Sequence, residues 1–220
     1  MCPLPLTRKP LLCYVTDRRS LADTPALARK LQLEKIEQAA KAGVDWIQIR
    51  EKDLSGRELA ELAERAMACA GSGSAVLIND RVDVACATGA SGAHVSERGL
   101  PVEAAKRLAS QRCGETGFLL GVSAHSPDAA REAEKGGADY VIFGPVFATP
   151  SKAAFGEPQG VRRLKEVCER LTIPVLAIGG ITLENAGDCL AVGATGIAAI
   201  RLFQDAANLD DLVRELRKVS

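Results

Sequence analysis

The residues in this 220-residue chain that could do chemistry are polar side chains that follow short apolar runs. Three of them are cations, Arg50, Lys52 and Lys152. Arginine offers a planar fork of N–H donors and lysine offers a point charge, so together they suit a diphosphate or triphosphate. Asn79 and Ser123 follow two further runs and add neutral donors. These residue types predict a site that binds a chain of phosphates.

A glycine pair and a carboxylate extend this interpretation. Gly179-Gly180 follows another apolar run, and glycines there allow backbone N–H groups to approach a second phosphate closely. Asp80 directly follows Asn79 and suits Mg²⁺, which needs only one or two protein carboxylates when substrate oxygens complete its shell. Two phosphate subsites imply two phosphorylated groups.

Each of these features also has an ordinary structural explanation. The glycine pair is typical of a plain turn, and residues 50–52 could form a solvated face of ion pairs. Asp80 could cap the helix expected after it, and His94 could be a hydrogen-bonded histidine inside the fold. His125, just before an expected helix, could be a passive residue of the rim. The joint pattern favours a site over packing alone.

Eight strand-length apolar runs, rich in valine and isoleucine, position these residues. Amphipathic helical patterns separate the runs, such as the stripe of Leu59, Leu62 and Ala66. Nearly continuous apolar strands indicate a parallel sheet covered on both faces. Eight such units predict an α/β fold, a (β/α)8 TIM barrel forming a single domain over residues 1–220, with its site at the carboxyl ends of the strands. A doubly wound open sheet is the alternative. The expected strands are 11–16, 45–50, 75–80, 92–96, 118–123, 140–146, 174–180 and 196–201.

Three helix starts can be assigned from capping residues. Ser55 with Glu58 predicts a capping box, Ser126 precedes Pro127, and Asn208 opens the last helix.

Composition narrows the class of protein. Lysine plus arginine and aspartate plus glutamate each number 28, so no net field attracts nucleic acid or an anionic membrane. The seven cysteines are odd in number and form no CxxC pair, which predicts reduced thiols, and two histidines without ligand spacing argue against zinc. Without a signal sequence or a membrane-length apolar stretch, the chain is expected to be cytoplasmic.

Several segments together resemble the thiamin-phosphate synthase/thiazole tautomerase family. They run in the family's order over nearly the whole chain: YVTD (14–17), QIREKD (48–53), INDRVDVA (78–85), GVSAHS (121–126), DYVIFGPVFATPSK (139–152), Gly160 with the helix after it, and PVLAIGGIT (174–182). The resemblance implies a transferase of thiamin biosynthesis. Such an enzyme joins hydroxymethylpyrimidine diphosphate to thiazole phosphate and releases pyrophosphate and thiamin phosphate.

The resemblance also implies a role for each matching residue. Arg50, Lys52, Asn79, Ser123 and Lys152 would grip the diphosphate, Asp80 would hold Mg²⁺, and Gln48 would orient the pyrimidine. Thr149 and Ser151 would line the thiazole side, and Gly179 and Gly180, with the backbone near Arg201, would seat the thiazole phosphate.

The sequence departs from the family pattern at two places. The family segment like GVHLGQEDLP reads GAHVSERGLP (92–101) here, which puts Gly99 where an aspartate is a second Mg²⁺ ligand. Glu97, two positions earlier, could replace that ligand. Arg201 stands where a small serine is usual, and its guanidinium could strengthen phosphate binding or invade the pocket.

Other functions stay open at this point. The tautomerase branch of the family uses a histidine like His125 as acid and base, whereas Lys52, Asp80 and Lys152 favour the synthase because a tautomerase binds no diphosphate. From a different class, a non-catalytic protein that binds a phosphorylated ligand or regulates through it is an alternative, and another phosphate-binding barrel enzyme, such as one of tryptophan biosynthesis, is a weaker one. The expected partners are small phosphorylated substrates, with no nucleic acid and no membrane, and the sequence leaves a homo-oligomer open.

Overall fold

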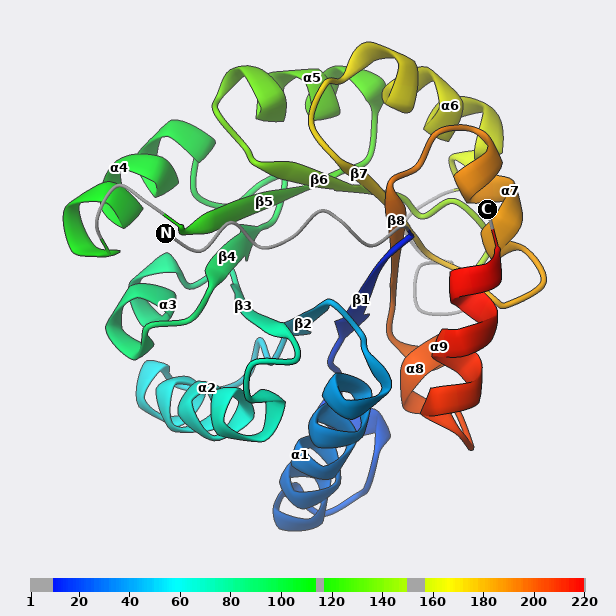
Figure 1. Cartoon of the computed structure of the whole chain (residues 1–220). Coiled ribbons are helices and arrows are strands. Elements are labelled where there is room, and N and C mark those ends of the chain that lie inside the picture. Colours follow the sequence, from blue (N-terminus) through cyan, green and yellow to red (C-terminus); the bar gives the residue numbers. More distant parts are fainter. Residues whose placement is uncertain (1–9, 114–116, 150–156, 220) are drawn as a thin grey trace.

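The computed structural model describes residues 10–113, 117–149 and 157–219, in which eight parallel strands close into a barrel (Figure 1). Each strand pairs with the next along the chain, and β8 pairs with β1. The predicted (β/α)8 barrel is confirmed, and the closure excludes a doubly wound open sheet. The strands are β1 (Leu11–Val15), β2 (Trp46–Ile49), β3 (Ala75–Asn79), β4 (Gly92–Val95), β5 (Leu119–Ala124), β6 (Tyr140–Phe143), β7 (Val175–Ile178) and β8 (Gly196–Ala199).

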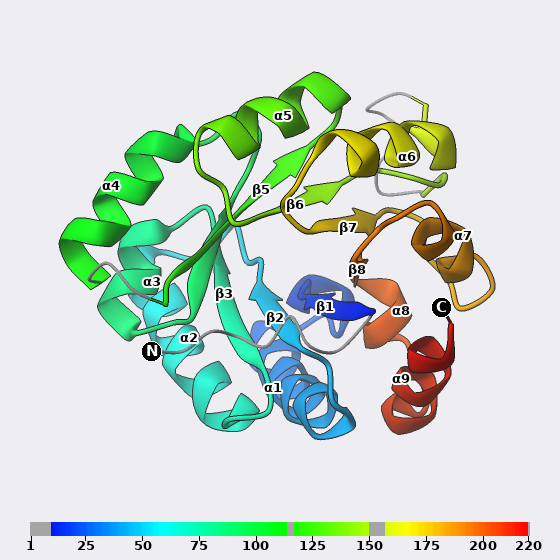
Figure 2. The same ribbon diagram turned by 45° about the horizontal axis from the view of Figure 1, so that its top comes forward.

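Helices surround the barrel on its outer side (Figure 2). They are α1 (Pro25–Ala42), α2 (Gly56–Ala70), α3 (Val82–Thr88), α4 (Val102–Cys113), α5 (Pro127–Lys135), α6 (Gly160–Arg170), α7 (Ala186–Ala191), α8 (Arg201–Gln204) and α9 (Leu209–Lys218), with a 3-10 turn η1 (Arg18–Ser20) after β1. The three assigned helix starts are confirmed, because Ser55 and Glu58 form the capping box and the side chains of Ser126 and Asn208 each accept a backbone N–H.

Three of the predicted strands end two or three residues early, at Phe143 instead of 146, at Ile178 instead of 180 and at Ala199 instead of 201. The strand expected over 174–180 ends at Ile178, because Gly179 and Gly180 have φ angles of 98° and 64°, which a strand cannot hold. Arg201, expected at the end of the last strand, instead begins α8.

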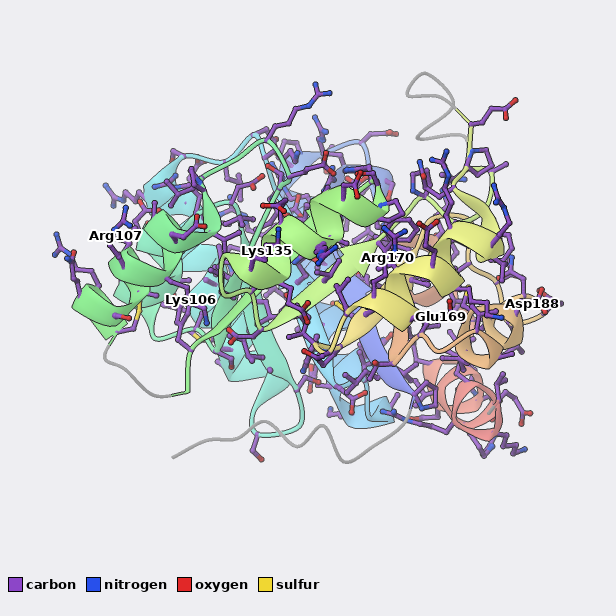
Figure 3. The ribbon with its side chains drawn as sticks, turned by 90° about the horizontal axis from the view of Figure 1, so that it is seen from above. Lys106, Arg107, Lys135, Glu169, Arg170 and Asp188 are labelled. Carbon is purple, nitrogen blue, oxygen red and sulfur yellow. A yellow bond between two sulfur atoms is a disulfide. The ribbon has the colours of Figure 1, made fainter. Side chains whose placement is uncertain are left out.

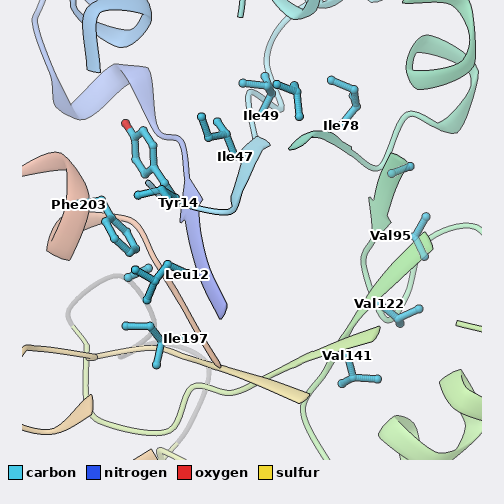
Figure 4. Packing of buried hydrophobic residues seen from close by; sticks show 14 of the residues in the cluster. Leu12, Tyr14, Ile47, Ile49, Ile78, Val95, Val122, Val141, Ile197 and Phe203 are labelled. Carbon is cyan, nitrogen blue, oxygen red and sulfur yellow. The ribbon is translucent and has the colours of Figure 1, made fainter. Parts of the chain in front are cut away.

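The core consists of two hydrophobic layers that alternate along each strand. Leu12 and Tyr14 of β1 face outward and pack in the layer between strands and helices (Figure 4). Leu11 and Cys13 face inward, into a cluster that also contains the Trp46 indole. Because large side chains fill the inside of the barrel, ligands are expected at the ends of the strands rather than within a central pore.

One disulfide, between Cys86 of α3 and Cys113 of α4, contradicts the prediction that the thiols are all reduced. Spacing in a sequence does not identify such a pair, because the helices must first bring residues 27 positions apart to a Cα–Cα distance of 5.3 Å. The free cysteines among the described residues are Cys13, Cys69, Cys168 and Cys189.

Charged side chains lie on the outer helices (Figure 3). Both signs occur together there, as where Arg170 pairs with Glu166 and lies near Asp128. Within the described residues, no helix has the length and apolar character needed to cross a membrane.

Candidate active site

The predicted site residues of strands β2 to β5 gather at the carboxyl ends of those strands. Gln48 lies on β2 opposite Leu77 of β3, and Asn79, the last residue of β3, lies opposite His94 of β4. Ser123 lies near the end of β5. Ser151 and Lys152 fall outside the described residues, and Thr149 is the last described residue before that gap.

A chain of hydrogen bonds joins Gln48, Asn79 and Asp80. Gln48 Nε2 donates to Asn79 Oδ1 at 2.8 Å, and Asn79 Nδ2 donates to Asp80 Oδ2 at 2.8 Å. The other carboxylate oxygen of Asp80 accepts the backbone N–H of Ser96 at 2.7 Å, and Lys52 Nζ lies 4.0 Å from Asp80 Oδ2. The structure therefore gives Asp80 a fixed orientation beside a cation.

Asp80 does not cap the helix that follows it. Arg81 is the N-cap residue of α3, and no side-chain cap bond is present there. Asp80 also has a φ of 59°, a conformation that is uncommon outside glycine and in which asparagine and aspartate are enriched. This backbone turns the chain sharply between β3 and α3, and its carboxylate bonds to Ser96 and Asn79 rather than to the helix end.

The charges at residues 50–52 do not form a solvated face of ion pairs, because Glu51 is buried. Its carboxylate accepts hydrogen bonds from the Thr16 hydroxyl at 2.7 Å, from Arg18 Nη1 at 2.7 Å and from Gln32 Nε2 at 2.6 Å. Thr16 Oγ1 in turn accepts the backbone N–H of Arg50 at 3.0 Å. Glu51 thus holds the loop that carries Arg50 and Lys52, and neither of those cations is used to neutralise it.

Sequence reasoning missed this supporting group of Thr16, Arg18, Gln32 and Glu51. Arg18 also binds Asp53 at 2.7 Å, and that hydrogen-bonded guanidinium lowers the pKa of Asp53 to about 2. Hydrogen bonds to Asp53 and Glu51 raise the pKa of Arg18 although burial opposes the shift. The run of alternating charge in REKD was the available signal, but Arg18 lies 33 residues before Glu51 and no local spacing links them.

His94 is a buried histidine with a partner on each ring nitrogen. Its Nδ1 lies 3.2 Å from the Tyr140 hydroxyl, and its Nε2 lies 2.8 Å from Ser123 Oγ. Burial lowers the pKa of His94 to about 3, so the imidazole is neutral near neutral pH. The explanation as a hydrogen-bonded barrel histidine therefore holds, and one of its bonds reaches a predicted site residue.

His125 and Glu97 form a pair at the rim of the barrel. Glu97 Oε2 accepts the backbone N–H of His125 at 2.7 Å and lies 2.8 Å from its Nδ1. Gly99 lies beside Asp80, since a Cβ built on it would be 3.4 Å from Asp80 Oδ1. Within the described part of the chain, no group of three or more His, Cys, Asp or Glu residues could hold a metal ion.

On the opposite side of the barrel mouth, the glycine pair approaches the loop after β6. A Cβ on Gly179 would lie 2.5 Å from the Pro145 side chain, and a Cβ on Gly180 would lie 2.6 Å from the carbonyl oxygen of Ala148. Positive φ and close packing together explain both glycines as features of this turn. Asn185 Nδ2 donates to the Gly180 carbonyl at 2.9 Å, while the Gly180 N–H has no partner among the described residues. The turn therefore presents a backbone donor, as a phosphate subsite requires.

Arg201 lines an open cleft together with Ile181 and Thr182, which directly follow the glycine pair. The cleft has a volume of about 540 Å³ and is lined by residues that include Thr182, Arg201 and Asn208. The Arg201 side chain is exposed, so its guanidinium is solvated.

Comparisons with known proteins agree on one family. The family model described as "Thiamine monophosphate synthase" matches residues 12–203. The thiamine-phosphate synthase of Chlorobium luteolum is 40% identical over 211 residues, which are 96% of this chain and 92% of that protein. The thiamine-phosphate synthase of Moorella thermoacetica is 38% identical over 188 residues, 85% and 87% of the two chains. Among solved structures, the thiamine phosphate pyrophosphorylase of Pyrococcus furiosus superposes with a TM-score of 0.81 at 34% identity and covers 96% of both chains.

Proposed function

This chain belongs to the thiamine monophosphate synthase family, and we propose that it couples hydroxymethylpyrimidine diphosphate to thiazole phosphate, with release of pyrophosphate. The observation that carries this proposal is the arrangement at the ends of β2 and β3. There Asp80, bonded to Asn79 and 4.0 Å from Lys52, faces the loop that Glu51 holds in place. Cations and an oriented carboxylate side by side suit a diphosphate accompanied by a divalent metal ion.

The reaction needs stabilisation of negative charge as the pyrophosphate departs. Arg50 and Lys52 would supply it, together with Ser123 and Asn79 as neutral donors. The pyrimidine methylene carbon becomes cationic as the bond breaks, and the thiazole nitrogen then attacks it. Gln48, bonded to Asn79, would orient the pyrimidine. Lys152 and Ser151 enter the proposal from the sequence alone.

The residues present fit a Mg²⁺ site in which Asp80 is the one protein ligand held in a fixed orientation. Each oxygen of Asp80 accepts one hydrogen bond, which orients the carboxylate and leaves a lone pair on each oxygen. Mg²⁺ would supply further neutralisation of the diphosphate when bound, and substrate oxygens and water would complete its shell. Glu97 remains the proposed second ligand, although its Oε2 already binds His125, so Oε1 is the oxygen left for a metal.

We propose that the second subsite, for the thiazole phosphate, lies at the glycine turn. The N–H of Gly180 and the guanidinium of Arg201 would hold the phosphate, with Thr149 on the thiazole side. The partners are then small phosphorylated molecules, which the chain would meet in the cytoplasm, where its function in biosynthesis is expected.

Thiazole tautomerisation is the second candidate, and the Glu97–His125 pair is the observation that favours it. A carboxylate that accepts the Nδ1 proton leaves Nε2 of a neutral histidine as a base. An acid–base histidine could then aromatise a thiazole carboxylate phosphate.

The test is to supply the purified protein with both synthase substrates and Mg²⁺ and to measure thiamin phosphate by fluorescence after oxidation. We expect turnover that Arg50→Ala lowers by at least about 100-fold, as expected for loss of a charged group that stabilises a transition state. A tautomerisation assay with His125→Ala runs in parallel. Product in the second assay alone, abolished by His125→Ala, would refute the synthase and establish the tautomerase; activity in neither would leave a non-catalytic ligand-binding protein.

A further inference from the structure

Tyr140, Gly121 and His94 lie at one level of the barrel. Gly121 of β5 is the register partner of His94 on β4 and of Tyr140 on β6. A Cβ on Gly121 would lie 1.9 Å from Tyr140 Cζ, so the phenol ring crosses over the glycine. The Trp46 ring packs against it with a centroid distance of 4.6 Å. The absence of a side chain at Gly121 is therefore what lets the Tyr140 hydroxyl reach His94 two strands away.

The direction of the hydrogen bonds in this group follows from burial. Tyr140 and His94 are each 1% exposed, so the phenol O–H requires an acceptor inside the protein. Among the described residues its hydrogen-bond partner is Nδ1 of His94, at 3.2 Å. A neutral imidazole that accepts at Nδ1 carries its proton on Nε2, and Nε2 lies 2.8 Å from Ser123 Oγ. His94 therefore donates to Ser123.

We infer that Tyr140 and His94 are positioning residues that fix the polarity of the Ser123 hydroxyl. Ser123 accepts the proton of His94 Nε2, and its own O–H is directed to a ligand in the barrel mouth. That ligand must be an acceptor, such as an anionic phosphate oxygen. Under the opposite polarity Ser123 would donate to His94 and present only lone pairs to the anion, which would repel it. The identification of the anion as a diphosphate rests on the proposed function, whereas the polarity does not.

The first test determines the tautomer of His94 without any ligand. The chain has two histidines, so nitrogen-15 imidazole spectra of the full protein contain two spin systems, and His125→Gln assigns them. We expect His94 protonated at Nε2 and unprotonated at Nδ1 at pH 7. Tyr140→Phe keeps the ring over Gly121 but removes the donor, and should produce a mixture of both tautomers. A His94 protonated at Nδ1 in the unmodified protein would overturn the inference.

Tyr14→Phe is the matched control. Tyr14, the other tyrosine of the chain, is also buried and donates to Gln204 Oε1 at 3.0 Å, but it lies in the outer layer. Its replacement removes the same hydroxyl and should leave the His94 signals unchanged. Thermal unfolding of both variants confirms that each is folded.

The second test measures binding of inorganic pyrophosphate with Mg²⁺ by calorimetry. Ser123→Ala should weaken binding by about 13- to 160-fold, the value of one hydrogen bond to a charged group, and Tyr140→Phe should weaken it by no more than that. Because Tyr140 acts through Ser123, the double variant should bind as Ser123→Ala does. A further loss in the double variant would refute the relay. If pyrophosphate fails to bind the unmodified protein while His94 has the expected tautomer, the diphosphate assignment fails and the polarity stands.

Discussion

Replacing Glu51 by alanine tests whether a buried ion pair holds the loop that carries Arg50 and Lys52. The Glu51 side chain is 1% exposed and that of Arg18 is 8% exposed, with 2.7 Å between Oε2 and Nη1. Removing the carboxylate leaves a buried guanidinium with a single remaining carboxylate, Asp53, and removes the acceptor of the Thr16 hydroxyl. Both effects disfavour the folded state.

The expected loss follows from the partners of Glu51. Breaking a buried pair by deleting one partner costs about 3–5 kcal/mol. Arg18 keeps the partly exposed Asp53, so we expect the lower part of that range, roughly 3 kcal/mol. In a chain of this size that corresponds to a fall in Tm of about 6–12 °C. Glu51→Gln keeps the volume of the side chain, but its NH2 group is a donor and would face the N–H and O–H donors that now bind the carboxylate. It should therefore also destabilise the fold.

Urea and thermal unfolding measure the change in the free energy of unfolding. The KM for the diphosphate substrate shows whether the loop still presents Arg50 and Lys52 to the substrate. Glu61→Ala is the control, because Glu61 pairs with Arg57 on the exposed face of α2 and should alter neither quantity measurably. In a double-mutant cycle with Arg18→Met, the two losses should be far from additive. A loss below about 1 kcal/mol for Glu51→Ala would refute the argument that this pair is a buried support.

Three further predictions concern other parts of the fold. Reduction of Cys86–Cys113 opens a covalent loop of 27 residues and should lower the stability by up to about 3.5 kcal/mol, seen as a reductant-dependent Tm that the double serine variant lacks. Burial lowers the pKa of His94 from 6.5 to about 3. Between pH 3 and pH 6.5, the imidazole is therefore protonated in the unfolded state and neutral in the folded state. The free energy of unfolding should therefore fall as pH decreases from about 6.5 towards 3, and a His94→Gln variant should lose that part of the pH dependence in urea titrations. Gly99→Asp would place a second carboxylate beside Asp80 and should tighten Mg²⁺ binding in calorimetry, and an unchanged affinity would contradict the proposed metal position.

The barrel could be predicted from the sequence because the patterns that indicate its strands and helices lie within a few residues of one another. Each strand is a short apolar run with a turn residue at its end, and the capping residues at Ser55, Ser126 and Asn208 are read within four positions. The strand expected over 140–146 ends at Phe143, because Pro145 has no backbone N–H with which to continue the ladder of hydrogen bonds. Helix α8 was missed because four residues are too few to form a periodic pattern.

The site could be predicted only in part from the sequence, because its contacts are not local. Residues that follow strands could be identified one by one, but the contacts that orient them join distant positions. Arg18 and Glu51 are 33 residues apart, and His94 and Tyr140 are 46 apart. Only the pairing of the strands in register brings such residues together, and the sequence separation of two residues does not predict it. The same holds for Glu97, whose contact with His125 spans 28 residues.

The crossing of Tyr140 over Gly121 also constrains how this protein can diverge. Even a methyl group on Gly121 would collide with the phenol ring, so neither position can change alone without loss of packing or of the bond to His94. In descendants of this sequence we expect the two positions to covary, with a side chain at 121 accompanied by a smaller residue at 140. A chain that keeps one but not the other would mark a lineage in which the hydroxyl of Ser123 has acquired a different function.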